Sequence, residues 1–114
     1  VRVPNAASYV ARLCGRYWVG YDLPRHMTVF APKTLRRALT QAGFEQIVHA
    51  YTSGSYLVLL HSLRFAMDDG RLSPQRAAAI HRVLLHPVMR ALAWAPFRLA
   101  DQLASGSTLE VLAR

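Results

Sequence analysis

Cysteine, lysine and acidic residues are all scarce in this chain of 114 residues, which has one cysteine, one lysine and six acidic residues. Because Cys14 stands alone, the sequence excludes a disulfide framework and a cysteine-rich zinc site. No uninterrupted apolar run approaches the roughly 20 residues that cross a bilayer. A single cysteine fits a reducing, cytoplasmic setting best, so we expect a cytoplasmic protein, with peripheral contact at the inner membrane as an open alternative.

The remaining composition is that of a folded chain. Hydrophobic residues make up 53% of the sequence and charged residues only 18%. This balance argues against disorder and supplies enough apolar side chains for a packed core. A length of 114 residues leaves room for one small domain.

The charge is strongly basic, with 14 basic and 6 acidic residues and a formal net charge of +8. Such a surplus suits an anionic partner such as phosphate, an acidic lipid or nucleic acid. The arginines are spread along the chain, however, and no block of five like charges occurs. A genome rich in G and C also encodes arginine in place of lysine without a functional reason. Nucleic-acid binding is therefore not favoured.

The chain begins with Val1, not Met, and residues 1–3 alternate like part of a strand that ends at Pro4. We expect, on this basis, a C-terminal piece of a longer protein. Further along, glycines, prolines and small polar residues separate segments of helical or alternating pattern. The patterns predict strands over residues 1–3, 45–52 and 108–113, and helices over residues 6–14, 32–42, 56–67, 73–86 and 88–103. This order is typical of an α/β fold.

Residues 16–31 have no helical period and are long for a connection inside a small domain. Loops of this length are often functional. The loop carries four side chains suited to a binding site, namely Trp18, Tyr21, Arg25 and His26.

Several short segments in a fixed order suggest a family. Pro4-Asn5 ends the first strand, Trp18 is followed by Asp-Leu-Pro-Arg-His at residues 22–26, and Phe-Ala-Pro at residues 30–32 begins a helix that ends in Ala-Gly-Phe at residues 42–44. In this order the chain resembles the C-terminal half of class I S-adenosylmethionine-dependent methyltransferases. The likeness is to the bacterial group that includes the ubiquinone-biosynthesis O-methyltransferases. It departs from that group at Ala31, where Ser or Thr usually caps the helix.

The resemblance implies a Rossmann-like, mostly parallel sheet of seven strands with helices on both faces. Its last strand, residues 108–113, would run antiparallel between the fifth (residues 1–3) and the sixth (residues 45–52). The chain would then be one C-terminal fragment: an acceptor-side part over residues 1–55, a helical insertion over 56–104 and a final strand over 105–114. The cofactor, S-adenosylmethionine, would be bound mainly by an N-terminal half outside this chain. The sequence contains no Gly-x-Gly-x-x-Gly loop, and we assign no cofactor-binding residue here.

Methyl transfer needs an acceptor in line with the methyl group, and a base where the acceptor carries a proton. On this reading the loop after Asn5 covers the acceptor, which is a small molecule or a lipid-like compound. His26 is the candidate base, or it binds a backbone carbonyl and shapes the loop. Arg25 pairs with an acidic acceptor or with Asp22.

The other candidate substrate-binding residues also have two readings. Trp18 and Tyr21 either wall the acceptor pocket or anchor the loop to the core. Asn5 either contacts the ligand or caps the next helix. The remaining histidines have no partner at metal-ligand spacing, so we predict no metal site.

Residues 56–104 are apolar and carry Arg82, Arg90 and Arg98 at near-helical intervals. Three interpretations stay open: buried core, which is the default for apolar helices, a lid over the substrate, or a surface that lies on a membrane. The function predicted from the sequence is thus part of a methyltransferase, inactive as an isolated chain. The alternatives are a non-catalytic membrane- or partner-binding α/β module and a degenerate pseudoenzyme.

Overall fold

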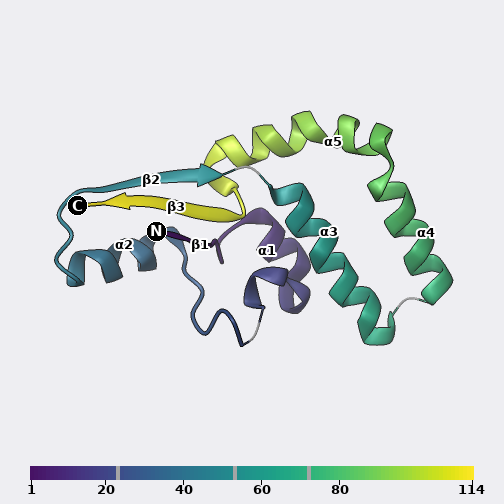
Figure 1. Ribbon diagram of the computed structural model, residues 1–114, viewed down its shortest axis with the longest axis horizontal. Helices are drawn as coiled ribbons and strands as arrows, with labels where there is room; N and C mark the ends of the chain where they lie inside the picture. The colour runs from purple at the N-terminus through teal and green to yellow at the C-terminus, as the bar shows by residue number, and fades with distance from the viewer. Residues whose placement is uncertain (23, 53, 72) are drawn as a thin grey trace.

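Three strands form one sheet in the order β1 (Arg2–Pro4), β3 (Thr108–Ala113) and β2 (Ile47–Thr52) in the computed structural model (Figure 1). The structure describes residues 1–22, 24–52, 54–71 and 73–114. The last strand runs antiparallel to both neighbours, so β1 and β2 point the same way. The expected central, antiparallel place of the last strand is confirmed, and the elements agree with an α/β fold. The described residues form three strands, and the seven-stranded sheet stays a prediction.

Helix α2 (Pro32–Gln41) covers one face of this sheet. Leu35 and Leu39 project from the helix one turn apart and pack against Leu109 and Val111 of β3. These apolar positions at the helical and strand periods explain why both elements form where the sequence predicts them. The opposite face carries Leu112, which is 65% exposed. One face of the sheet is therefore packed, and on the other this large apolar side chain is left exposed.

The first helix begins later than the sequence predicts. Helix α1 spans Tyr9–Cys14, three residues later than expected, and Ser8 caps it by accepting a hydrogen bond from the Ala11 N–H at 3.1 Å. The residues before Ser8 are needed elsewhere, because Asn5 is tied to the start of β3. Asn5 is consequently not a helix cap. The predicted end is confirmed, since Gly15 follows with a φ of 52°.

Three longer helices form an arm beyond the sheet: α3 (Ser55–Ala66), α4 (Pro74–Leu85) and α5 (Pro87–Ala100). The predicted breaks are confirmed. Ser73 caps α4 ahead of Pro74, and the arm turns again at His86, ahead of Pro87. Proline supplies no N–H for the preceding turn, which is why both helices start there. In Figure 1, α4 and α5 lie at the outer edge of the molecule, away from α2.

The arm is more exposed than the sequence suggests. Helix α4 buries only Ala77, and α5 buries none of its described residues, so the default expectation of buried core is wrong for these two helices. The chain is extended, with a radius of gyration of 15.8 Å against about 13 Å for a compact domain of this length. It exposes 7997 Å², where a compact monomer of this mass exposes about 6,300 Å². The apolar periodicity of the sequence alone therefore did not show which helices pack against other parts of the protein and which stay exposed to solvent.

Among the residues that the structure describes, no helix is long and apolar enough to span a bilayer.

Candidate functional site

The two ends of the segment between β1 and α2, which contains the loop predicted to be functional, lie side by side at the edge of the sheet. Asn5, directly after β1, forms a parallel bridge with Phe30, and the Ala6 N–H donates to the Phe30 carbonyl at 2.9 Å. The Asn5 N–H donates to the Ser107 carbonyl at 3.0 Å, just before β3. The loop is thus closed at its base at the carboxyl end of β1, the end of a strand where α/β folds bind ligands.

The middle of the loop is packed against helices α1 and α3. Trp18 is 2% exposed and lies in a cluster with Val10 and Ala11 of α1. Next to it, the Val19 N–H donates to Ser62 Oγ of α3 at 2.9 Å. Gly20 then passes close to the Trp18 indole: a Cβ built on Gly20 would lie 2.3 Å from that ring. The loop is therefore held by a buried tryptophan that requires glycine two residues later.

This contact gives a prediction for the Gly20→Ala variant. The added methyl must displace the buried Trp18 ring, and we expect a loss of about 2 kcal/mol in the free energy of unfolding, as for other overpacked sites. Urea unfolding measures the loss, and the near-ultraviolet circular dichroism of the tryptophans reports the displaced ring. As a control, the Cβ of Gly15→Ala meets no atom within 4 Å, so it should cost backbone strain only and leave the tryptophan signal unchanged. An unchanged tryptophan signal in Gly20→Ala would contradict the packing described here.

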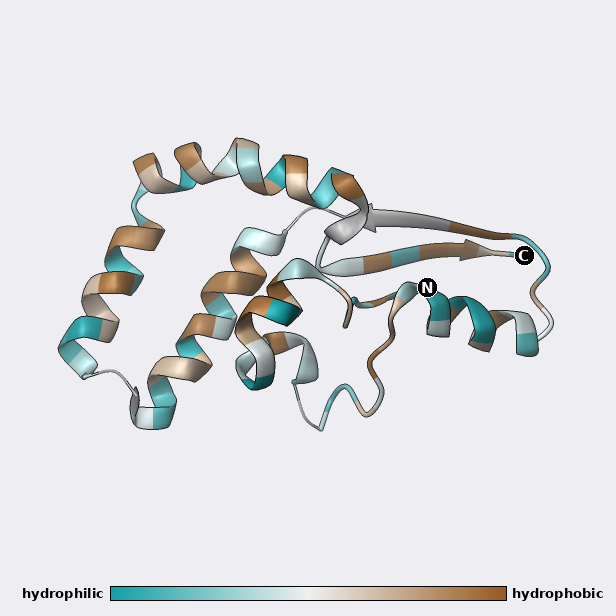
Figure 2. Ribbon diagram, turned by 180° about the vertical axis from the view of Figure 1, so that it is seen from behind, coloured by the Kyte–Doolittle hydropathy of each residue, from teal (hydrophilic) through white to brown (hydrophobic). Residues whose placement is uncertain are grey.

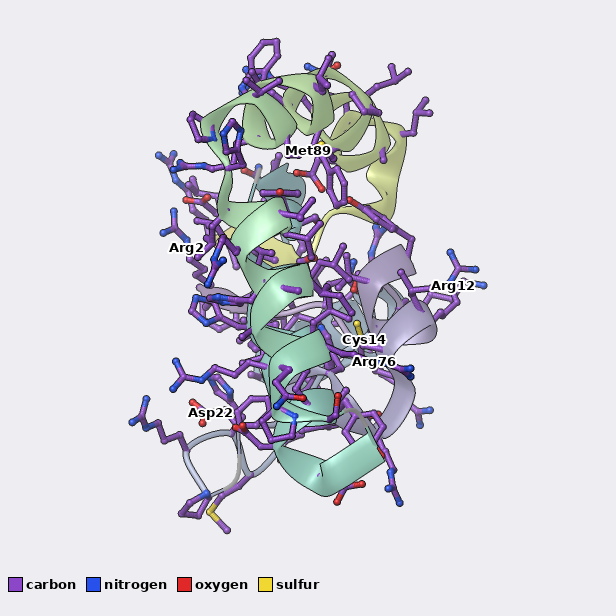
Figure 3. All side chains as sticks on the ribbon, turned by 90° about the vertical axis from the view of Figure 1, so that its right-hand side faces the viewer. Arg2, Arg12, Cys14, Asp22, Arg76 and Met89 are labelled. Atoms are coloured by element: carbon purple, nitrogen blue, oxygen red, sulfur yellow. The ribbon has the colours of Figure 1, made fainter. Side chains whose placement is uncertain are left out.

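A cavity of about 370 Å³ opens between this loop, β1 and the start of β3. Such a volume is within the range that accommodates small ligands. The loop contributes Trp18, Asp22 and His26, β1 contributes Arg2, and the turn before β3 contributes Ser107. Residues far apart in the sequence meet here because the loop base and the β1–β3 pairing bring them to one edge of the sheet. Figure 3 shows Arg2 and Asp22 on the same side of the molecule, opposite Arg12.

Two nitrogen atoms of residues lining this cavity have no hydrogen-bond partner in the described part of the chain. They are the indole Nε1 of Trp18 and the imidazole Nδ1 of His26, and both are buried. A buried polar atom without a partner costs free energy, so it marks a place where a ligand or water is expected to bind. The indole can only donate a hydrogen bond, whereas the imidazole can donate or accept a proton. Together they suit a ligand with an oxygen or nitrogen function.

The turn that carries His26 is held by Asp22. The N–H groups of Arg25 and His26 both donate to the Asp22 carbonyl, at 2.8 and 3.2 Å. Asp22 itself has a φ of 21°, a conformation in which Asp and Asn are enriched among non-glycine residues. The backbone of this short turn therefore determines where the imidazole lies.

The structure separates the predicted site residues into two groups. Trp18 and His26 line the cavity. Tyr21 instead packs edge-on against Trp18, with ring centroids 5.2 Å apart, and Arg25 is exposed and pairs with Asp22 at 3.5 Å. Of the alternatives considered for Arg25, the bridge to Asp22 is the one present.

Asn5 is not among the residues that line the cavity, and its predicted contact with a substrate stays a prediction. It is 1% exposed, and both ends of its amide are engaged. Nδ2 donates to the Gly106 carbonyl at 2.8 Å and Oδ1 accepts from the Ala7 N–H at 3.0 Å. The amide therefore joins the carboxyl end of β1 to the turn before β3.

Sequence reasoning missed a buried polar cluster beside this joint. Ser55 at the start of α3 donates to the Asp101 carboxylate, and its Oγ also lies 2.7 Å from Ser107 Oγ. The second carboxylate oxygen of Asp101 accepts from the Gly54 N–H at 3.2 Å. The cluster connects the ends of the helical arm to the strand edge that borders the cavity. The matching Ser-Gly-Ser segments at 53–55 and 105–107 are the signal in the sequence that could have pointed to this cluster.

Local environment shifts three pKa values nearby, and none of them creates a nucleophile. Burial raises the pKa of the Cys14 thiol, against a hydrogen bond with Ser62, so the thiol stays protonated and unreactive. Burial also raises the pKa of the Tyr9 phenol, which Ser55 lowers and the charge of Asp101 raises. The pKa of Arg16 is raised, chiefly by its hydrogen bond to Tyr17 and also by Asp69. Arg16 therefore stays charged in its contact with Asp69 at 2.5 Å, which ties the loop to the end of α3.

Comparison with known proteins identifies no family. No family model, curated protein or solved structure matches the chain. Within the described ranges no group of three or more His, Cys, Asp or Glu side chains is placed to hold a metal ion. The geometry of the cavity is the available guide to function.

Proposed function

We propose that this chain is the acceptor-side part of an S-adenosylmethionine-dependent methyltransferase and that the cavity beside His26 receives the methyl acceptor. The observation that carries the proposal is the cavity at the carboxyl end of β1, lined by Trp18 and His26, each of which has a buried nitrogen atom without a hydrogen-bond partner among the described residues. The acceptor is a small molecule or a lipid-like compound with an ionisable hydroxyl or amine. Trp18 donates to it, and His26 Nδ1 takes its proton as the acceptor reacts.

The strand arrangement supports the same proposal. In the methyltransferases that the sequence resembles, the last strand is antiparallel between two strands of common direction, and β3 has this relation to β1 and β2. Sheets of that class carry helices on both faces. Here α2 covers one face while Val48 and Leu112 on the other are exposed, which leaves surface for further helices of the complete fold.

The residues of this chain do not fit the cofactor itself. No glycine-rich loop follows β1, and the Asn5 side chain at its carboxyl end is engaged at both ends of its amide. Asp22 follows a 3₁₀ turn, not a strand that would direct a carboxylate at a ribose. The proposal therefore assigns the cofactor to residues outside the 114. The 114 residues bind and orient the acceptor.

Two measurements test the proposal. In calorimetry, the 114-residue chain should show no micromolar affinity for S-adenosylmethionine. In the complete gene product that contains this chain, His26→Gln should lower kcat by 100-fold or more for a proton-carrying acceptor, with little change in KM, because loss of a general base costs about 10²–10⁴ in rate.

A second histidine provides the matched control. His61 is exposed on α3 and does not line the cavity, so His61→Gln should retain both kinetic constants. Micromolar binding of the cofactor by the 114 residues alone would contradict the division of roles. A complete gene product without methyl transfer, or without a glycine-rich loop ahead of this segment, would contradict the function.

A further inference from the structure

Helix α5 presents an apolar stripe to solvent instead of to the core. At about 100° per residue, Val88, Leu92, Ala95 and Leu99 fall within an arc of about 60°, and all four are exposed. The positions that face the protein are Ala93, Phe97 and Ala100, on the other side of the helix. Leu92 is 67% exposed, and Leu103 continues the stripe beyond the helix. Exposed apolar side chains that gather on one side of a helix in this way mark a candidate interaction surface.

The charges around the stripe are all of one sign. Residues 70–100 contain no acidic side chain and five arginines. The structure describes the side chains of four of these arginines, and none of the four forms an ion pair with another described residue: Arg76, Arg82, Arg90 and Arg98. Figure 3 faces α4 and α5 with the sheet behind them and labels Arg76 and Met89 on this side. Figure 2 shows the same helices with apolar and polar positions interleaved.

A groove with an exposed tryptophan lies on another side of α5, between this helix and the start of α3. Arg90, Trp94 and Arg98 lie along one flank of α5 and line a groove of about 480 Å³. Trp94 is 65% exposed, and the Arg98 guanidinium lies 5.5 Å from its ring centroid. Asp101 also borders the groove, but its carboxylate is occupied by Ser55 and the Gly54 N–H. Two guanidiniums beside an exposed indole suit an anionic group held next to an apolar layer.

From these observations we infer that α4 and α5 dock on the surface of an anionic lipid bilayer, with the outer stripe of α5 in the acyl region and the arginines at the headgroups. A bilayer surface is the occupant that supplies an apolar layer and a dense negative charge together. A two-fold contact between copies of this chain would instead bring Arg82, Arg90 and Arg98 against the same residues, with no acid on this face to offset them. The inference goes beyond methyl transfer and does not depend on it.

Vesicle sedimentation of the full 114-residue chain tests this inference. We expect binding to vesicles of phosphatidylcholine with 25% phosphatidylglycerol and weak binding to phosphatidylcholine alone. Arg82→Gln/Arg90→Gln/Arg98→Gln should lower the partition coefficient by on the order of 100-fold, since each arginine near such a surface contributes about five-fold. Leu92→Asn/Leu99→Asn should abolish binding, and both variants should stay folded because the replaced side chains are exposed. Binding should also shift Trp94 emission to the blue.

Helix α2 offers a charge-matched control. Lys33, Arg36 and Arg37 are exposed at the opposite end of the molecule, so replacing all three by glutamine removes the same charge and should leave binding within about two-fold. An equal loss in this control would overturn the inference, because net charge would then account for binding. Absence of wild-type binding to anionic vesicles would overturn it as well. A dimer in analytical ultracentrifugation that Leu92→Asn/Leu99→Asn dissociates would assign the stripe to a second copy of the chain instead.

Discussion

Replacing Asn5 with alanine is expected to lower the free energy of unfolding by about 3 kcal/mol. The substitution leaves the Gly106 carbonyl and the Ala7 N–H without their partners, and each unsatisfied buried group costs about 1–3 kcal/mol. The side chain is fully enclosed, so water cannot replace it without opening the joint between β1 and the turn before β3. Because the base of the loop is held at the same joint, the Trp18 signal should also change. Urea unfolding followed by tryptophan fluorescence measures both effects.

The Asn5→Asp variant distinguishes the contribution of the Asn5 hydrogen bonds to stability from that of its packing, because the two side chains have nearly the same size. The carboxylate keeps the acceptor for the Ala7 N–H but turns an oxygen toward the Gly106 carbonyl, so at pH 7 it should destabilise at least as much as alanine. Burial and that carbonyl raise the pKa of the new carboxyl in the folded state above about 3.9, its unfolded value. The folded state then holds the proton to higher pH, so stability is greatest below about pH 4 and falls as pH rises through the folded pKa. Wild-type stability in Asn5→Ala, or no such recovery in Asn5→Asp relative to the wild type, would show that the amide does not join these segments.

Leu109→Ala is expected to cost about 4 kcal/mol. Leu109 has no exposed surface and lies on the central strand against Leu35 and Leu39 of α2, so its removal leaves a cavity that the sheet cannot close. Single domains are stable by about 5–15 kcal/mol, and this chain has few other fully buried large side chains. The substitution should therefore remove most of the cooperative unfolding transition, as measured by circular dichroism during urea or thermal unfolding.

The control for Leu109 lies on the same strand. Leu112 points to the open face and is largely exposed, so Leu112→Ala should change stability by less than about 0.5 kcal/mol. A similar cost in the two variants would indicate that the open face is covered in solution, and the one-sided sheet described here would be wrong.

Several elements could be predicted from the sequence because their signals are local. Pro32 and Gly43 enclose α2, Ser73 with Pro74 begins α4, and Pro87 begins α5. Each signal acts through hydrogen bonds within four residues, so it works in the same way whatever the rest of the chain does. Residues 108–113 were predicted as a strand with the same bounds that the structure has.

The candidate site was only partly predictable. Trp18 and His26 were identified because aromatic and titratable residues are concentrated in one long loop. The interpretation of Asn5 as a helix cap is wrong, because its partner, Gly106, lies 101 positions away in the sequence and could not be identified from it. The Ser55–Asp101–Ser107 cluster is hidden for the same reason, since Ser55 lies 46 and 52 positions before its two partners. Contacts between residues so far apart in the sequence produce no periodic pattern of residue types from which they could be predicted.

By itself, the sequence determined the order and approximate positions of the helices and strands, the apolar faces they carry and the basic charge of residues 70–100. Tertiary structure decided which of those faces are covered: α2 against the sheet, but not the outer stripe of α5. The physical reason is that an apolar stripe forms from residues three and four apart, whereas its burial depends on whether another element is available to pack on it. The cavity beside His26 and the exposed basic helices follow from that arrangement, and both proposed functions depend on it.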